Sequence, residues 1–322
     1  MAKYYVGIDG GGSKTKFVCF DSLGQECGSA VTLGSYWAQD GIDAVLDRLR
    51  DGIARCLPEK TEDVVIGFGV SGYGENRELD ELAVDRIRAL FSPMRVHIDS
   101  DSITGWAGSL VMEPGVSVIA GTGSIAFGRD ASGKIARCGG WHELFSDEGS
   151  GYWLGKQLLQ IFSQQSDGRL EKTVLYDLVR SELALADDFD IINYVNEHCV
   201  SSRKNTAALQ MILLKSARSG DSHALACYDR ASAELARLIL TVIQELDFSG
   251  EKVPVSFQGG LFSLEDLILN PVAQKVANAN IGKQINFCRP RLSPCHGSVL
   301  LAVSELEPEN LNYLLSRFRD FE

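Results

Sequence analysis

The chain has 322 residues, of which 45% are hydrophobic and 23% charged, so it can bury two cores and has the composition of an ordinary globular protein. Its formal net charge of -12 opposes a broad surface for nucleic acid or anionic membranes and leaves a small molecule as the expected partner. No apolar stretch approaches the ~18 residues that a membrane span needs.

The first predicted element is a β-hairpin with a triple glycine at its tip, in the sequence YYVGIDGGGSKTKFVCFD (residues 4–21). A P-loop needs Gly-Lys-Ser/Thr at the start of a helix, but Ser13 follows Gly12 and Lys14 comes one place late. A dinucleotide-binding loop would also open a helix. Residues 14–20 are instead rich in β-branched and aromatic side chains. The glycines therefore predict a turn between two strands.

Helices and strands alternate after this hairpin. In the first half, apolar spacing predicts helices over 41–57 and 81–91 and buried strands over 63–72 and 95–101, which indicates a mixed α/β domain. The second half is more helical: we expect helices over 172–183, 206–220, 222–248 and 297–306, and a strand with a glycine turn over 253–263.

No low-complexity linker separates the two halves. We place the domains at 1–117 and 118–322, with a hinge near 112–118 and a cleft between them. The sequence is compatible with a last helix that packs back on the first domain.

Residues 114–134, PGVSVIAGTGSIAFGRDASGK, repeat the order of parts in the first hairpin. Five turn and hydroxyl positions match at one constant offset: Gly12, Ser13, Thr15, Asp21 and Gly24 correspond to Gly121, Thr122, Ser124, Asp130 and Gly133. If a duplicated domain places the two hairpins face to face, their backbone amides and hydroxyls would grip a polyphosphate from both sides. Asp9 would then hold Mg²⁺, directly or through water.

Eight cysteines are scattered without any Cys-x-x-Cys pair, and the N-terminus lacks a charged segment followed by an apolar run. They are Cys19, Cys27, Cys56, Cys138, Cys199, Cys227, Cys288 and Cys295. We therefore expect reduced thiols in a cytoplasmic protein. The sequence does not determine the oligomeric state, and a homodimer is compatible with it.

Six motifs run through the chain in the order GIDGGGSKT, DSDSITGWAG, VIAGTGSIAFG, CGGWHELFSDEGSGYWLG, SFQGGLFS and SPCHGSVLLA. Together they resemble the BadF/BadG/BcrA/BcrD ATPase family of the actin-like ATPase superfamily, and within it the N-acetylglucosamine kinases. The resemblance implies an α/β fold of two ribonuclease-H-like domains around an interdomain cleft. ATP would lie between the hairpins and a sugar beside its γ-phosphate.

The resemblance also implies roles for single residues. Asp9 would hold Mg²⁺. Asp9 and residues of the two loops form the predicted ATP site: Asp9, Gly11, Gly12, Ser13, Thr15, Gly121, Thr122, Gly123 and Ser124. Gly259 and Gly260 resemble the adenosine loop. Asp101 resembles the general base that accepts the proton of the attacking sugar hydroxyl. Asp99 competes for that role, although the pattern D-x-x-x-G-x-x-G starts at Asp101. Alternatively, Asp101 only caps a helix beginning at Ser102.

Several residues resemble the sugar site of the family: Gly139, Gly140, Trp141 and Asp147, with Thr122 and Asp101 beside the sugar. His142 and Ser146 replace the small residues usual in this loop, and we interpret His142 as structural. In the stretch LGSYWAQDG, Ser35 takes the place of an asparagine before Trp37. We expect both to line the sugar site, where the shorter serine would leave room for a bulky substituent.

The expected protein is an ATP- and Mg²⁺-dependent kinase that phosphorylates N-acetylglucosamine at the 6-hydroxyl, with glucosamine and N-acetylmuramate as alternative acceptors. Other members of the family are ATP-driven activators of CoA-ester reductases and dehydratases. These hold an iron–sulfur cluster on paired cysteines, and the cysteines here form no such pair. A sugar-responsive repressor would need a helix-turn-helix before the first hairpin, but the first strand is expected to start by Tyr4.

Overall fold

The structure is a computed structural model that describes residues 3–58, 61, 63–248, 250 and 252–319. It divides into two compact α/β units, unit 1 with residues 1–117 and 289–322 and unit 2 with residues 118–288. Residues 289–322, which the sequence interpretation assigned to the second domain, thus belong to unit 1. Within the described chain, none of the helices is both long and apolar enough to cross a membrane.

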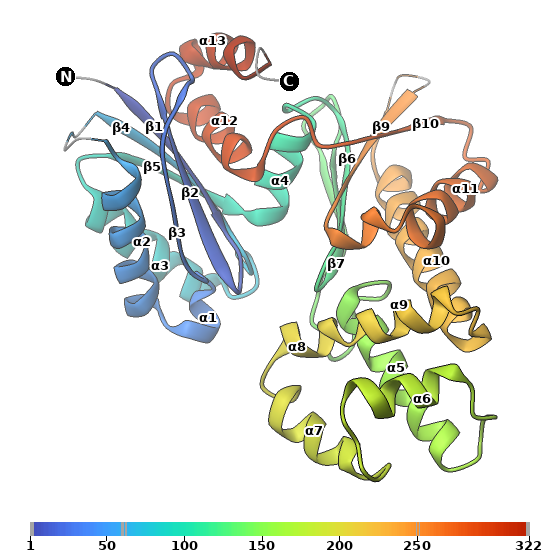
Figure 1. The fold of residues 1–322 in the computed structure, drawn as a ribbon. Coiled ribbons are helices and arrows are strands. Elements are labelled where there is room, and N and C mark those ends of the chain that lie inside the picture. Colours follow the sequence, from blue (N-terminus) through green and yellow to red (C-terminus); the bar gives the residue numbers. More distant parts are fainter. Residues whose placement is uncertain (1–2, 59–60, 62, 249, 251, 320–322) are drawn as a thin grey trace. The chain divides into compact units, whose positions relative to one another are not determined.

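Unit 1 is built on a five-stranded mixed sheet in the order β3-β2-β1-β4-β5 (Figure 1). Strand β1 pairs with β2 in antiparallel fashion and with β4 in parallel, and β4 pairs in parallel with β5. The elements are β1 (Tyr4–Gly10), β2 (Lys14–Asp21), β3 (Glu26–Leu33), α1 (Trp37–Asp40), α2 (Ile42–Cys56), β4 (Val64–Val70), α3 (Arg77–Phe91), β5 (Arg95–Ser100), α4 (Asp101–Ser109), α12 (Pro294–Leu306) and α13 (Pro308–Arg319).

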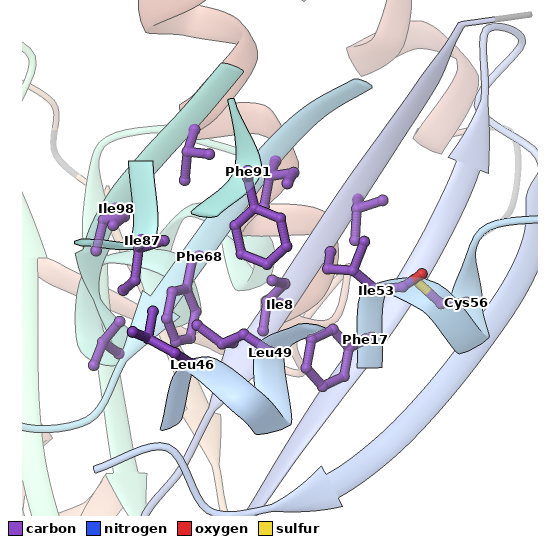
Figure 2. Close-up of a cluster of buried hydrophobic side chains, with 14 of the residues drawn as sticks. Ile8, Phe17, Leu46, Leu49, Ile53, Cys56, Phe68, Ile87, Phe91 and Ile98 are labelled. Atoms are coloured by element: carbon purple, nitrogen blue, oxygen red, sulfur yellow. The ribbon is translucent and has the colours of Figure 1, made fainter. Parts of the chain in front are cut away.

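Side chains alternate between the two faces of this sheet, and each face has its own core. Val6 and Ile8 of β1 belong to the cluster formed with α2 and α3, part of which Figure 2 shows with Ile8, Phe17 and Leu49. Tyr5 belongs to the cluster formed with α12 and α13. By the same alternation, Asp9 projects on the side of Tyr5, toward the face that α12 covers.

Helix α12 lies against the middle of the sheet because two glycines make room for it. A methyl group built on Gly7 would overlap the carbonyl of Cys295, and one on Gly67 would overlap the carbonyl of Ser298. A bulkier residue at either position would push the helix off the strands. This close approach explains why residues far along the chain complete unit 1.

The start of α13 is fixed by Glu307, whose side chain is only 4% exposed. Its carboxylate accepts hydrogen bonds from Lys3 (2.6 Å) and Asn310 (2.9 Å) and pairs with Arg95. Burial alone would raise the pKa of this carboxyl, but these partners lower it to about 2. The ionised group therefore ties the start of α13 to Lys3, which precedes β1, and to Arg95 at the start of β5.

Unit 2 repeats the sheet of unit 1. Its order, β10-β9-β6-β7-β8, becomes that of unit 1 when β6 to β10 stand for β1 to β5. The elements are β6 (Gly115–Ala120), β7 (Ser124–Arg129), β8 (Ile135–Gly139), α5 (Gly151–Ser166), α6 (Val174–Glu182), α7 (Asp190–His198), α8 (Arg203–Ala208), α9 (Gln210–Arg218), α10 (Ser222–Glu245), β9 (Lys252–Gln258), η1 (Gly260–Ser263), η2 (Glu265–Leu269), α11 (Asn270–Asn278) and β10 (Gln284–Cys288).

The repeat extends to the hydrogen bonds of the turn that follows each hairpin. The Asp21 carboxylate accepts from the amides two and four residues on (2.8 and 2.9 Å), and Asp130 does the same (2.9 and 3.0 Å). Gly24 and Gly133 have φ of +78° and +88°, which favours glycine in both turns. The internal repeat expected from the sequence is therefore confirmed.

Candidate active-site residues in each unit

The turn between β1 and β2 is held from one side by backbone hydrogen bonds. The Gly11 amide donates to the Lys14 carbonyl (3.1 Å), and the Gly11 carbonyl accepts from the Ser35 amide (3.1 Å). A trans peptide points its carbonyl and the following amide in opposite directions, so the Gly12 amide points away from Ser35. Among the described residues this amide has no acceptor, and a methyl group on Gly12 would meet nothing within 4 Å. The first turn is therefore open to an acceptor oxygen.

Asp9 is next to the end of β1, and Lys16 is its cross-strand partner in β2. Burial raises the pKa of the Asp9 carboxyl, and the charges of Lys14 and Lys16 oppose that shift. No hydrogen bond to this carboxylate comes from the described residues. A half-buried carboxylate without hydrogen-bond donors is stabilised by a nearby cation.

The chemistry of Asp9 fits one kind of cation site. Among the described residues, no three His, Cys, Asp or Glu side chains are grouped so that they could hold a metal ion. Mg²⁺ does not need such a cage, because it keeps several waters and takes one or two carboxylates together with substrate phosphates. Asp9 therefore fits a magnesium ion that arrives with a phosphate ligand.

Asp99 and Asp101 flank the junction between β5 and α4. Ser100 is the N-cap of α4 and Asp101 its first residue, so the interpretation of Asp101 as the cap is wrong. The Asp99 carboxylate accepts from the Ser100 amide (2.8 Å) and lies 3.8 Å from Nε2 of His97. Because β1, β4 and β5 are parallel, their C-terminal ends share one edge of the sheet. Asp9 and Asp101 both lie at this edge.

Ser35 and Trp37 are buried inside unit 1. The Ser35 hydroxyl lies beside Gly10 and has no hydrogen-bond partner in the described chain. The Trp37 indole N–H donates to Asp80 (2.9 Å), and its ring meets Tyr73 edge-on with 6.3 Å between centroids. Trp37 is thus a core residue in this conformation, and sugar contacts by Ser35 or Trp37 stay a prediction.

The turn between β6 and β7 is held by the first residues of α5. The amides of Gly151 and Tyr152 donate to the carbonyls of Gly121 (2.8 Å) and Thr122 (3.1 Å). Since these two carbonyls point toward α5, the amides that follow them, of Thr122 and Gly123, point the other way. Neither amide has an acceptor among the described residues, and a methyl group on Gly121 would meet nothing within 4 Å. Adjacent outward amides of this kind form an anion-binding nest.

The end of β8 and the segment after it meet at two glycines that the backbone requires, Gly139 in the strand and Gly140 after it. Gly139 and Gly140 have φ of +78° and +65°, and a methyl group on Gly140 would press on the Ile125 side chain of β7. Trp141 follows with 73% of its surface exposed, and the Arg137 guanidinium lies 5.8 Å from its ring centre. This indole is available to a ligand.

His142 makes its contacts with neighbouring residues of the same segment. Its Nδ1 accepts a hydrogen bond from the Leu144 amide (3.2 Å), and its ring stacks on Phe145 with 5.7 Å between centroids. Both contacts are local. They agree with the structural role expected for His142.

Asp147 closes the segment with a φ of +65°, unusual for a residue other than glycine, and is 2% exposed. Its Oδ1 accepts the amide of Ser124 (3.1 Å), and its Oδ2 pairs with Arg203. The Ser124 hydroxyl in turn donates to the Glu148 carbonyl (2.7 Å). The predicted sugar residue thus supports the turn that carries the predicted phosphate contacts.

Gly259 and Gly260 follow β9, which neighbours β6 in the sheet. Gly259 has a φ of +98°, and a methyl group on it would overlap the Ala120 carbonyl at the end of β6. A methyl group on Gly260 would meet nothing within 4 Å. The backbone at Gly259 therefore lies directly beside the strand that leads into the second turn.

Unit 2 brings all of its predicted site motifs to one end of β6 and β7, and unit 1 brings Asp9, the first turn and Asp101 to one edge of its sheet. Sequence reasoning missed Arg203, which lies in no motif. A lone basic residue after a serine at a helix start gives no signal of its own, because only the fold brings it to Asp147.

Comparison with known proteins agrees with the fold. A solved structure of a candidate N-acetylglucosamine kinase from Chromobacterium violaceum matches with a TM-score of 0.74 and 24% identity, over 93% of this chain and 99% of that one. The predicted fold class is confirmed, since each unit is α/β with a mixed five-stranded sheet.

Two curated relatives match over nearly their whole lengths. The N-acetylmuramic acid/N-acetylglucosamine kinase of Clostridium acetobutylicum is 28% identical over 95% of this chain and 100% of its own. The N-acetyl-D-glucosamine kinase of Dictyostelium discoideum is 30% identical over 93% of this chain and 98% of its own. The sequence model of the BadF/BadG/BcrA/BcrD ATPase family matches residues 6–302, and the chain belongs to that family.

Proposed function

We propose that this protein is an ATP-dependent kinase that transfers a phosphoryl group to the 6-hydroxyl of an amino sugar, with N-acetylglucosamine as the first candidate. The observation that carries the proposal is the pair of repeated turns with outward amides at Gly12, Thr122 and Gly123. The two relatives, which match end to end and are both kinases of N-acetylated amino sugars, support the substrate class.

The turns would bind the phosphates of ATP through the backbone. Phosphoryl transfer leaves little covalent chemistry to the protein, so its task is positioning and charge stabilisation. Amides that already point outward need no reorganisation when the substrate binds. The hydroxyls of Ser13, Thr15 and Ser124 stand at or beside the same turns and are assigned to the nucleotide, and Gly259 and Gly260 to the adenosine.

Asp9 would hold Mg²⁺ on the phosphate side, directly or through water. The ion supplies neutralisation of the charge that develops on the phosphoryl oxygens. The pKa of Asp9 is raised because partial burial disfavours its ionised carboxylate. The charges of Lys14 and Lys16 on the neighbouring strand oppose this shift.

Asp101 would accept the proton of the sugar hydroxyl that attacks phosphorus. It is the first residue of α4, where a carboxylate faces the positive end of the helix. Sugar recognition is assigned to Gly139, Gly140, Trp141 and Asp147, whose segment offers an exposed indole and a carboxylate.

The test is ADP release measured with purified protein, ATP and Mg²⁺ over a panel of N-acetylglucosamine, N-acetylmuramate, glucosamine and glucose. We expect turnover on the N-acetylated amino sugars, with phosphate found on the 6-hydroxyl by NMR. A protein that hydrolyses ATP but phosphorylates no sugar in the panel would not be this kinase. The eight free cysteines fit a reducing compartment, and we assign the protein to the cytoplasm.

A further inference from the structure

The pair formed by Asp147 and Arg203 has an unusual place in unit 2. The Asp147 carboxylate is almost fully buried, whereas the Arg203 side chain is 43% exposed. A methyl group on Gly123 would overlap the guanidinium of Arg203 and lie 2.9 Å from Oδ1 of Asp147. The second turn, the end of the segment after β8 and the start of α8 therefore meet at one point.

The backbone that carries Arg203 is well fixed. Arg203 is the first residue of α8, whose N-cap Ser202 accepts the amide of Asn205 (3.2 Å). The Thr206 hydroxyl donates to the Cys199 carbonyl (3.3 Å), and Gly155 of α5 leaves room for the Thr206 carbonyl. Since α5 also holds the second turn, Arg203 and the turn share one support.

A carboxylate accepts about four hydrogen bonds in all. At Asp147, the Ser124 amide and Arg203 use part of this capacity, one on each oxygen. The proposed contacts with sugar hydroxyls would use the remaining capacity. The carboxylate is thus held at both oxygens, by the Ser124 amide at Oδ1 and by the Arg203 guanidinium at Oδ2.

We propose that Arg203 is a positioning residue for the sugar. It holds the Asp147 carboxylate against the turn between β6 and β7, so that the segment after β8 that is assigned to the sugar keeps a fixed position relative to this turn. The inference rests on the proposed kinase function. Arg203 itself need not touch either substrate. Loss of Arg203 should mainly weaken sugar binding, because the Ser124 amide is then the remaining hydrogen-bond partner of Asp147 among those described.

The experiment compares wild type, Arg203→Ala, Arg203→Gln and Arg203→Lys in the ADP-release assay, with Lys204→Ala as the matched control. Lys204 is the exposed neighbour on α8 and has the same charge. We expect Arg203→Ala to raise KM for N-acetylglucosamine on the order of 10- to 100-fold, since breaking one side of a buried charge pair is costly and the exposed guanidinium softens that cost. The value of kcat should change much less, and Arg203→Lys should recover part of the loss.

A double-mutant cycle with Asp147→Asn separates positioning from general damage. If Arg203 acts through Asp147, Arg203→Ala should add little in the Asp147→Asn background. If the effects of the two substitutions on KM are additive, the inference is overturned. It is also overturned if Arg203→Ala is active and has the same KM for N-acetylglucosamine as Lys204→Ala. If Arg203→Ala does not fold, a wild-type KM for Arg203→Gln would overturn it. A wild type that phosphorylates no sugar fails the proposed function itself, and this inference falls with it.

Discussion

Replacing Gly12 or Gly121 by alanine should stabilise the fold and weaken ATP binding at the same time. Neither glycine has φ in the left-handed region, and an added methyl group at either site meets nothing within 4 Å. The fold therefore does not explain why these positions are glycine. Alanine in a compatible conformation stabilises a protein by about 0.4–1 kcal/mol, because it restricts the unfolded chain.

We expect the added methyl group to stand in front of the outward amides, because both positions are open. If phosphate oxygens approach there, a methyl group holds them off hydrogen-bonding distance. Loss of one charge-assisted hydrogen bond is worth about 1.5–3 kcal/mol, which is roughly a 10- to 150-fold rise in KM for ATP. The assay is urea denaturation for the free energy of unfolding, together with KM for ATP from ADP release.

Gly220→Ala is the opposite control. Its φ is +82° and its surroundings are also open, so alanine there should cost about 1–2 kcal/mol of stability and leave KM for ATP unchanged. The reasoning is refuted if Gly12→Ala and Gly121→Ala gain stability and keep the wild-type KM. If both variants lose stability instead, the turns need glycine for themselves.

Three further changes test other parts of the argument. Asp101→Asn should lower kcat by roughly 10²- to 10⁴-fold with nucleotide affinity retained, and equal losses with Asp99→Asn would contradict its role as the base. Because the pKa of Glu307 is lowered from 4.5 to about 2 in the folded protein, its ionisation stabilises the fold above about pH 4.5, and this stability is lost as the pH falls toward 2. Glu307→Gln should remove that part of the pH profile of unfolding in urea, and an unchanged profile would exclude the pair as its source. Gly67→Ala should lower the free energy of unfolding by about 1–3 kcal/mol, since the added methyl group overlaps a carbonyl of α12; a wild-type value would mean that the helix moves away at little cost.

The two hairpins and their repeat could be predicted from the sequence because their signals are local. Strand residues, glycines and the Asx turns at Asp21 and Asp130 lie within a few residues of the bonds they make. Apolar spacing also predicts the helix over 222–248. The observed helix α10 begins at the same residue and ends three residues earlier. Local chemistry also corrects a boundary: α3 begins at Arg77 rather than 81, since Asn76 caps it and accepts the amide of Leu79 (3.1 Å).

Other features depend on contacts that no local pattern encodes. The helix predicted over 206–220 is two helices, α8 and α9, which meet at Leu209, a buried residue. The placement of residues 289–322 in unit 1 depends on glycines near the opposite end of the chain. In the candidate site, the sequence predicts residue types but not their partners. Trp37 donates to Asp80 and Asp147 pairs with Arg203, which only the fold could show.

The two turns have the same backbone design but different supports, and this difference has a consequence for function. The first turn is supported by the Ser35 amide, and half-buried Asp9 stands beside it. The second is supported by the amides of α5 and by Asp147, itself held by Arg203. Unit 1 therefore offers a carboxylate for a cation beside its turn, and unit 2 offers a turn that is linked to the predicted sugar residue Asp147. Changes behind the second turn should then alter KM for sugar as well as for ATP, whereas changes at Asp9 should alter the dependence on Mg²⁺ and spare sugar binding.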